Sequence, residues 1–349
     1  MIINEGHQKI KLIILLLVFF ECLLSILIIQ RTNKRYLFDK EILVKFQKYG
    51  LIKKFFSNQS SSKNYNYSFA IITRRHKGPN GLFGYYNSYI SCLYIYLNNG
   101  FIPILDFSSF PNIFNHFKIQ SLEKDDNPWE FFFNQPFEYT LKYVKKYAKK
   151  IRYVNCIPKY KPTTNIFKKK FLLSFWHDIA LKYIPIKNEI IKKSNEYRKR
   201  LFNNSNNVLG VLVRGTDYTN MKPQGHPVQP SSKIVIEDVK KMDKFNKYDW
   251  IFLATEDNLI RMKFISSFGK KLKYIKYNKF KYNYYKKEYI AFNTNSIDII
   301  EFMKIYLINI VILSKCIDII SSRTAGAVGV FIYSNGFRNA KVYYLGRYK

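Results

Sequence analysis

The chain has 349 residues, 47% of them hydrophobic and 18% aromatic, which excludes global disorder and suggests two domains of ordinary size. Its 58 Lys and Arg residues against 24 Asp and Glu residues give a formal net charge of +34. The cations are spread among Asn, Ile and Tyr rather than gathered in one stripe, so specific nucleic-acid binding is not indicated. We expect instead an anionic membrane surface or a phosphate-bearing substrate as partner.

An apolar run at residues 12–29 follows a short N-terminal tail, 1–11. The run is as long as a spanning helix, and no small-residue cleavage site follows it. We therefore expect an uncleaved single-pass membrane anchor rather than a signal peptide. Basic residues on both flanks leave its sidedness open between a Golgi-type lumenal domain and one on the cytoplasmic face of a bacterial inner membrane. Residues 30–67 form the expected stem, which ends in a polar low-complexity linker.

The four cysteines have neither C-x-x-C nor metal-ligand spacing: Cys22, Cys92, Cys156 and Cys316. Cys22 lies in the apolar run, which leaves an odd number elsewhere. We therefore expect buried free thiols rather than a complete disulfide framework.

Folded sequence begins near residue 68. A strand at 69–73, a loop containing Gly81 and Gly84, a helix at 85–98 and a strand at 101–106 predict a βαβ unit. The two glycines either form only a turn or let a ligand approach the N-terminus of the helix. Residues 137–200 are expected to be mostly helical and basic, so 68–202 is predicted to be an α/β domain with a helical insertion, on the acceptor side.

Residues 203–349 show the alternation of a doubly wound parallel sheet, and with the first domain they predict an α/β fold of two Rossmann-like domains. The expected strands are 208–214, 250–255, 272–276, 317–321 and 342–345. The expected helices are 231–243, 257–268, 296–315 and one that begins at Ala325.

Three of these strands end in polar residues, and the carboxyl ends of parallel strands meet at one edge of a sheet, where ligands bind. The first strand ends at Arg214, the second is followed by Glu256 and Asp257, and Ser322 and Thr324 follow a third. The sequence therefore predicts one crevice that these side chains share.

This set of residues suits a nucleoside diphosphate. A guanidinium at a strand end offers a planar fork of donors to a phosphate. Ser322 and Thr324 precede a predicted helix, whose N-terminus favours anions. Glu256 and Asp257 can accept hydrogen bonds from base or ribose hydroxyls. The chain has no D-x-D motif, so neither a metal nor another cofactor is expected.

Three motifs resemble those of the fucosyltransferase superfamily, in its α1,2, α1,6 and nodulation branches. The stretch 210–217, Gly-Val-Leu-Val-Arg-Gly-Thr-Asp, is similar to the donor-binding motif, and His226-Pro227 follows as in the α1,6 branch. The stretch 252–257 resembles the second motif and 313–324 the third. Gly81 to Gly84 and residues 127–130 are similar, more loosely, to the N-terminal glycine loop and the region after it.

The resemblance implies a GT-B-like fold and an inverting transfer of fucose from GDP-fucose, without metal, to a hydroxyl of a glycan acceptor. Arg214 would contact the β-phosphate, with Asp217 supporting the site. The guanosine end would be held by Glu256 and Asp257, and a phosphate by Ser322 or Thr324. Gly81 and Gly84 would also lie on the donor side.

Some positions depart from the family pattern. Leu212 stands where His is common, Gly215 where a second Arg is common, Lys222 where the α1,6 branch has an acid, and Asn309 where an Asp is expected. The general base is therefore open between His226 and Asp217. The alternatives are the same fold with another nucleotide sugar, and an inactive membrane-tethered carbohydrate-binding or scaffold protein.

Overall fold

The computed structural model describes residues 67–73, 81–110, 112, 126–158, 161–276, 299–334 and 336–349. These residues belong to one compact unit, Asn64–Lys349. The predicted tail and anchor, and the stem up to residue 66, lie outside the described ranges. Within those ranges no helix has the length and hydropathy needed to cross a membrane.

A three-stranded parallel sheet is built from the first part of the unit. Its strands are β1 (Ser68–Ile72), β2 (Ile102–Leu105) and β3 (Lys150–Val154), in the order β2-β1-β3. The helix α2 (Leu82–Asn98) connects β1 to β2, which confirms the predicted βαβ unit. Strand β3 was not predicted, because its sequence Lys-Ile-Arg-Tyr-Val carries the charges of an exposed edge.

Residues 137–200 are mostly helical, as predicted, apart from β3. The helical elements of this part of the chain include α4 (Leu141–Tyr147), α5 (Lys170–Tyr183), α6 (Asn188–Phe202) and the 3₁₀ turns Pro128–Phe131, Pro136–Glu138 and Thr164–Lys168. Trp129 is fully buried and stacks on Phe133 at 4.4 Å between ring centroids, so this aromatic cluster packs the core. His177 of α5 has its Nδ1 atom 2.8 Å from the carbonyl oxygen of Ile332, in a structural contact.

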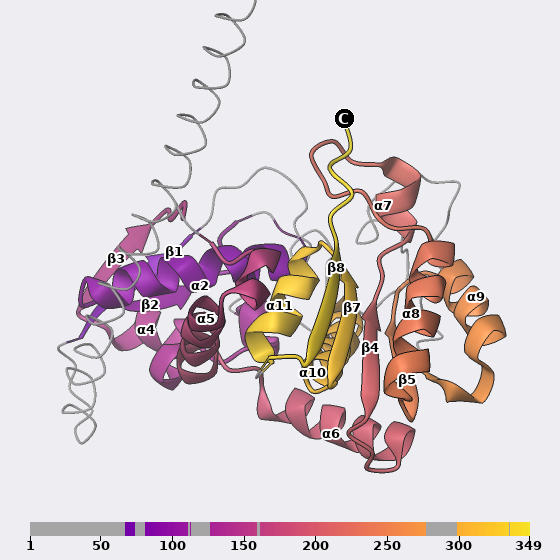
Figure 1. The fold of residues 1–349 in the computed structure, drawn as a ribbon. Helices are drawn as coiled ribbons and strands as arrows, with labels where there is room; N and C mark the ends of the chain where they lie inside the picture. The colour runs from indigo at the N-terminus through magenta and orange to yellow at the C-terminus, as the bar shows by residue number, and fades with distance from the viewer. Residues whose placement is uncertain are drawn as a thin grey trace, which may run out of the picture. The chain divides into compact units, whose positions relative to one another are not determined.

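A five-stranded parallel sheet is built from the second part (Figure 1). Its strands are β4 (Val208–Leu212), β5 (Trp250–Ala254), β6 (Leu272–Lys273), β7 (Asp318–Ser322) and β8 (Asn339–Tyr343). The helices are α7 (Thr216–Met221), α8 (Ser232–Asn246), α9 (Asn258–Phe268), α10 (Ile299–Ser314) and α11 (Ala325–Tyr333), with a 3₁₀ turn at Gly269–Lys271. Parallel sheets with helices between their strands confirm the predicted α/β class.

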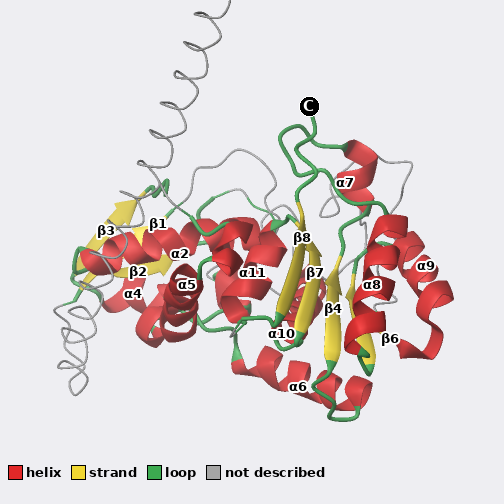
Figure 2. Cartoon of the chain, viewed as in Figure 1, coloured by secondary structure: helices red, strands yellow, loops and turns green. Residues whose placement is uncertain are grey.

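Helices cover both faces of this sheet (Figure 2). Leu209 and Val211 of β4 pack in one core with Val235 of α8 and Phe264 of α9. The residue between them, Gly210, faces the opposite side, where a Cβ atom would lie 3.0 Å from the side chain of Leu313 in α10. Because successive residues of a strand point to opposite faces, β4 is buried on both sides and its apolar run is continuous.

The order of the strands determines where a ligand can bind. The sheet order is β6-β5-β4-β7-β8, so the chain runs outward from β4 in one direction and from β7 in the other. Leu212 of β4 lies opposite Ser321 of β7, which places the carboxyl ends of these strands side by side. In sheets of this kind ligands bind at such a reversal of strand order. Both sheets lie in the one compact unit, and the division into two domains at residue 202 stays a prediction.

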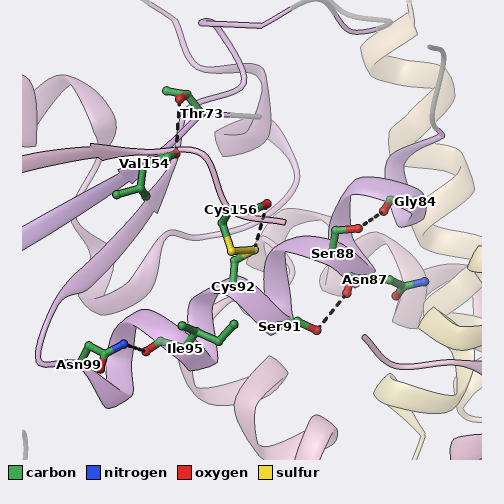
Figure 3. Close-up of a disulfide and its surroundings, with 10 residues drawn as sticks. All are labelled: Thr73, Gly84, Asn87, Ser88, Ser91, Cys92, Ile95, Asn99, Val154 and Cys156. Atoms are coloured by element: carbon green, nitrogen blue, oxygen red, sulfur yellow. Dashed lines mark hydrogen bonds between the residues drawn. A yellow bond between two sulfur atoms is a disulfide. The ribbon is translucent and has the colours of Figure 1, made fainter. Parts of the chain in front are cut away.

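The prediction of free thiols was wrong for two of the cysteines. Cys92 of α2 and Cys156, which follows β3, form a disulfide with a Cα–Cα distance of 6.0 Å (Figure 3). They are 64 residues apart in sequence, and only the fold brings α2 against the edge of the sheet. Cys316 is a buried free thiol, as predicted. Cys22 lies outside the described residues.

Candidate active site at the carboxyl edge of β4

Arg214 follows β4 and is held by two carboxylates. Its Nη2 donates a hydrogen bond of 2.7 Å to Oδ1 of Asp217, and its Nε lies 3.4 Å from Oε1 of Glu256. The guanidinium also lies over the ring of Tyr218, 5.0 Å from its centroid. The side chain is 19% exposed, so it is oriented by the protein and still accessible at the edge of the sheet. The structure thus brings three of the predicted residues together.

The charges of this group perturb one another. Burial opposes the charge of Arg214, but the carboxylates of Asp217 and Glu256 outweigh it and raise its pKa above the ordinary value. Burial raises the pKa of Glu256, and the nearby Asp217 adds to this while Arg214 acts against it. Arg214 therefore stays charged, whereas Glu256 is a carboxyl group that holds its proton to a higher pH than usual.

A tight turn connects Arg214 to α7. Thr216 is fully buried and has φ +43°, a left-handed conformation that is rare for a β-branched residue. Its backbone N–H donates to Oδ2 of Asp257 at 2.9 Å, and its hydroxyl donates to Oε1 of Glu256 at 2.9 Å. Strained backbone of this kind persists only where surrounding contacts impose it, commonly at functional sites. The turn fixes the backbone that follows Arg214 at the carboxyl end of β4.

Packing accounts for Gly215, one of the departures from the family pattern. A Cβ atom at this position would lie 2.1 Å from Oδ2 of Asp257. The N–H group of Gly215 donates to Oε1 of Glu256 at 3.0 Å. An Arg could not be accommodated here without moving the Asp257 carboxylate, so the glycine is a requirement of this site.

Asp257 has a structural role that the sequence reasoning did not include. It is 4% exposed, and its Oδ1 accepts a hydrogen bond of 3.0 Å from the backbone N–H of Ile260, which caps α9. Its Oδ2 accepts from Thr216. Its predicted contact with guanosine is untested and stays a prediction.

Strand β7, which neighbours β4, leads to hydroxyl groups at the point where the strand order reverses. Ser322 ends β7 and is completely buried, and its Oγ atom has no hydrogen-bond partner in the described part of the chain. The hydroxyl of Thr324 accepts from the N–H of Ala327 at 3.2 Å and caps α11. A buried hydroxyl without a partner beside the N-terminus of a nine-residue helix is suited to an anionic ligand.

His226 lies on a loop held by the last residues of the chain. The N–H of Tyr348 donates to the His226 carbonyl at 2.9 Å, and Val228 donates to the Gly346 carbonyl at 3.1 Å. The imidazole is 5.4 Å from the ring of Tyr218, measured between centroids. Burial lowers the pKa of His226, and the nearby Arg347 lowers it further against the influence of Asp217. His226 is therefore a neutral imidazole at neutral pH.

The two glycines lie at the start of α2, which begins three residues earlier than predicted. Gly81 is its N-cap with φ −66°, and a Cβ atom there would meet nothing within 4 Å. Gly84 lies inside the first turn, where its N–H donates to the Gly81 carbonyl at 2.8 Å. Neither a positive φ nor a close contact requires glycine at position 81, and a donor-binding role for the pair stays a prediction.

Sequence reasoning missed Tyr306 of α10. Its hydroxyl lies against Gly326 at the start of α11, where a Cβ atom would be 2.1 Å from the hydroxyl oxygen. Burial raises its pKa, while the charge of Arg214 acts in the opposite direction, which places the two groups in one electrostatic environment. Phe83 of α2 packs edge-to-face on its ring at 5.8 Å between centroids. No motif marked this tyrosine within an apolar helix.

The other departures are accommodated by the fold. Leu212 is buried in β4, and Lys222 is an exposed residue that ends α7 with φ +48°. The side-chain amide of Asn309 donates to the Ile305 carbonyl of its own helix at 2.8 Å. In the described ranges, no group of three or more His, Cys, Asp or Glu residues has an arrangement that could hold a metal ion.

No protein-family model and no curated protein matches this chain. Among solved structures, it is similar to a NodZ α-1,6-fucosyltransferase soaked with GDP-fucose, at 13% identity and a TM-score of 0.44, covering 76% of this chain and 93% of that one. The fucosyltransferase NodZ from Bradyrhizobium gives 13% identity, a TM-score of 0.41 and coverages of 75% and 92%. POFUT1 in complex with GDP gives 7% identity, a TM-score of 0.41 and coverages of 80% and 99%.

Proposed function

We propose that this chain is a glycosyltransferase that transfers fucose from GDP-fucose to a hydroxyl group of a glycan, with two GT-B-like domains. The observation that carries the proposal is the placement of Arg214. It lies at the carboxyl end of β4, is oriented by Asp217 and Glu256, and borders the point where the strand order reverses. A fixed guanidinium at that point is suited to a diphosphate leaving group.

In this proposal the protein stabilises the charge that develops on the departing diphosphate. Arg214 contacts the β-phosphate, and Ser322 with the N-terminus of α11 contacts a phosphate oxygen. These groups take the role that a divalent cation has in metal-dependent transferases, so no metal is required. Glu256 holds the ribose or base through its carboxyl group, and Asp257 supports this end of the site.

The acceptor hydroxyl attacks the anomeric carbon in one displacement, which inverts its configuration. We assign the general base to His226 rather than Asp217. The Oδ1 atom of Asp217 already accepts hydrogen bonds from Arg214 and from the N–H of Tyr218. The lowered pKa of His226 keeps the imidazole ready to accept a proton at neutral pH.

We also propose that residues 12–29 anchor the protein in a membrane. Of the two orientations, the Cys92–Cys156 disulfide supports the one in which the catalytic unit lies in an oxidising, lumenal compartment. Maleimide tagging of the denatured protein, isolated from native membranes, tests this. In this orientation Cys92 and Cys156 are tagged only after reduction, whereas tagging without reductant would contradict it.

The function is tested by equilibrium binding of the full chain in detergent to GDP-, UDP- and dTDP-sugars, in the presence of EDTA. We expect GDP-fucose to bind most tightly. Tighter binding of another nucleotide sugar would mean that the donor is not GDP-fucose. Binding only with added divalent cation would contradict the metal-free site. Binding of no nucleotide sugar would overturn the enzyme proposal in favour of a carbohydrate-binding or scaffold protein.

A further inference from the structure

The start of α11 is surrounded by polar groups that the fold does not satisfy. Ser322 Oγ is buried without a partner in the described ranges. Asn87 of α2 is 5% exposed and donates from Nδ2 to the carbonyl of Ala325 at 3.3 Å, which fixes the orientation of its amide. Its Oδ1 atom is then also buried without a hydrogen-bond donor among the described residues. Two separate side chains therefore indicate a ligand at this helix end.

Tyr306 brings a third polar group to the same place. Its hydroxyl occupies the space that a side chain at Gly326 would fill, directly against the first turn of α11. Within the described ranges the hydroxyl makes no hydrogen bond, although its ring is fixed by Phe83. Burial raises its pKa, so the group remains a protonated donor over the working pH range.

The position of Tyr306 distinguishes it from an ordinary core tyrosine. Tyrosine hydroxyls away from solvent normally find a protein partner, as the partly buried Tyr333 of α11 does by donating to Tyr86 at 2.7 Å. Tyr306 instead shares the electrostatic environment of Arg214 and Glu256. Its hydroxyl lies against the first turn of α11, and the charge of Arg214 acts on it.

We propose that Tyr306 is a further donor-binding residue, whose hydroxyl donates a hydrogen bond to the β-phosphate of the nucleotide sugar. The absence of a side chain at Gly326 leaves the space at the first turn of α11 that this hydroxyl occupies. The inference rests on the proposed function, since it requires a diphosphate in the site. The hydrogen bond from Tyr306 is made to the β-phosphate and to no other part of the donor.

Tyr306→Phe in the full chain tests this through the affinities for GDP and GMP. Loss of a hydrogen bond to a charged group weakens GDP binding by roughly ten- to a hundredfold. GMP binding stays within about twofold, because GMP lacks the β-phosphate; a merely structural role would weaken both. Tyr333→Phe is the matched control, which removes a hydroxyl near the other end of α11 and leaves the ratio of the two affinities unchanged.

Gly326→Ala provides the second measurement. The new methyl group displaces the hydroxyl, so GDP binding weakens in this variant and changes little further when Phe is already present at position 306. Equal GDP affinity in wild type and Tyr306→Phe, or additive effects of the two substitutions, would overturn the inference. If the wild type itself binds no GDP, it is the proposed function that fails.

Discussion

Gly215→Ala tests the packing that orients Arg214. The added Cβ atom would lie 2.1 Å from Oδ2 and 2.6 Å from Cγ of Asp257, so the carboxylate must move. That carboxylate caps α9 through Ile260 and holds Thr216. Loss of a helix cap costs about 1 kcal/mol, and a buried acceptor left mispaired costs about 1–3 kcal/mol. We expect the free energy of unfolding to fall by about 2–4 kcal/mol in total.

Denaturant-induced unfolding of the full chain measures this loss as a shift of the midpoint. Gly81→Ala is the control for stability, because its Cβ atom meets nothing within 4 Å and its φ of −66° suits any residue. We expect that control to change the free energy by less than about 1 kcal/mol. A Gly215→Ala protein within about 0.5 kcal/mol of wild type would refute the close packing of this turn on Asp257.

Four further predictions follow from the same geometry. Arg214→Ala removes roughly 2–4 kcal/mol of transition-state stabilisation and lowers kcat/KM for sugar transfer accordingly, measured by release of nucleoside diphosphate. Full activity would exclude its assigned role. In the wild type, kcat/KM falls on acidification with a midpoint below the ordinary His value of 6.5, and His226→Asn abolishes this limb; a limb that persists in the variant excludes His226 as base. The pKa of Glu256 is raised, so the folded state holds this proton more tightly than the unfolded state does. As the pH rises from 4.5 through the folded pKa, the free energy of unfolding of wild type therefore falls relative to that of Glu256→Gln. Unfolding curves of the two proteins at several pH values measure this difference, and a constant difference counts against the raised pKa. Replacement of Cys92 and Cys156 by Ser lowers the free energy of unfolding by about 2–4 kcal/mol, as does reductant on the wild type; insensitivity to reductant would contradict the disulfide.

Periodicity and residue type were enough to predict the main elements of the larger sheet. The continuous apolar run of β4 is buried on both faces, which is why it is readable without alternation. The same reasoning failed for β3, whose exposed edge position permits charged residues. It also placed the start of α2 at Tyr85 instead of Leu82, because the glycine at position 84 was interpreted as part of the loop.

The sequence predicted those residues of the site that directly follow a strand. Arg214 and Glu256 follow adjacent strands, so the parallel sheet brings them together. The left-handed turn at Thr216 depends on contacts from Asp257, and Tyr306 comes from a helix about ninety positions later in the chain. Contacts of this kind arise from tertiary packing and carry no local pattern. The Cys92–Cys156 pair was missed for the same reason.

The most direct measurement of the central claim is the release of GDP from GDP-fucose by the full chain, with EDTA present and a glycan acceptor supplied. We expect wild type to release GDP in proportion to fucosylated product, with inverted configuration at the anomeric carbon. The Arg214→Ala variant is expected to release it roughly 30- to 1,000-fold more slowly. Equal rates in the two proteins, or no release by wild type with any nucleotide sugar, would contradict the account.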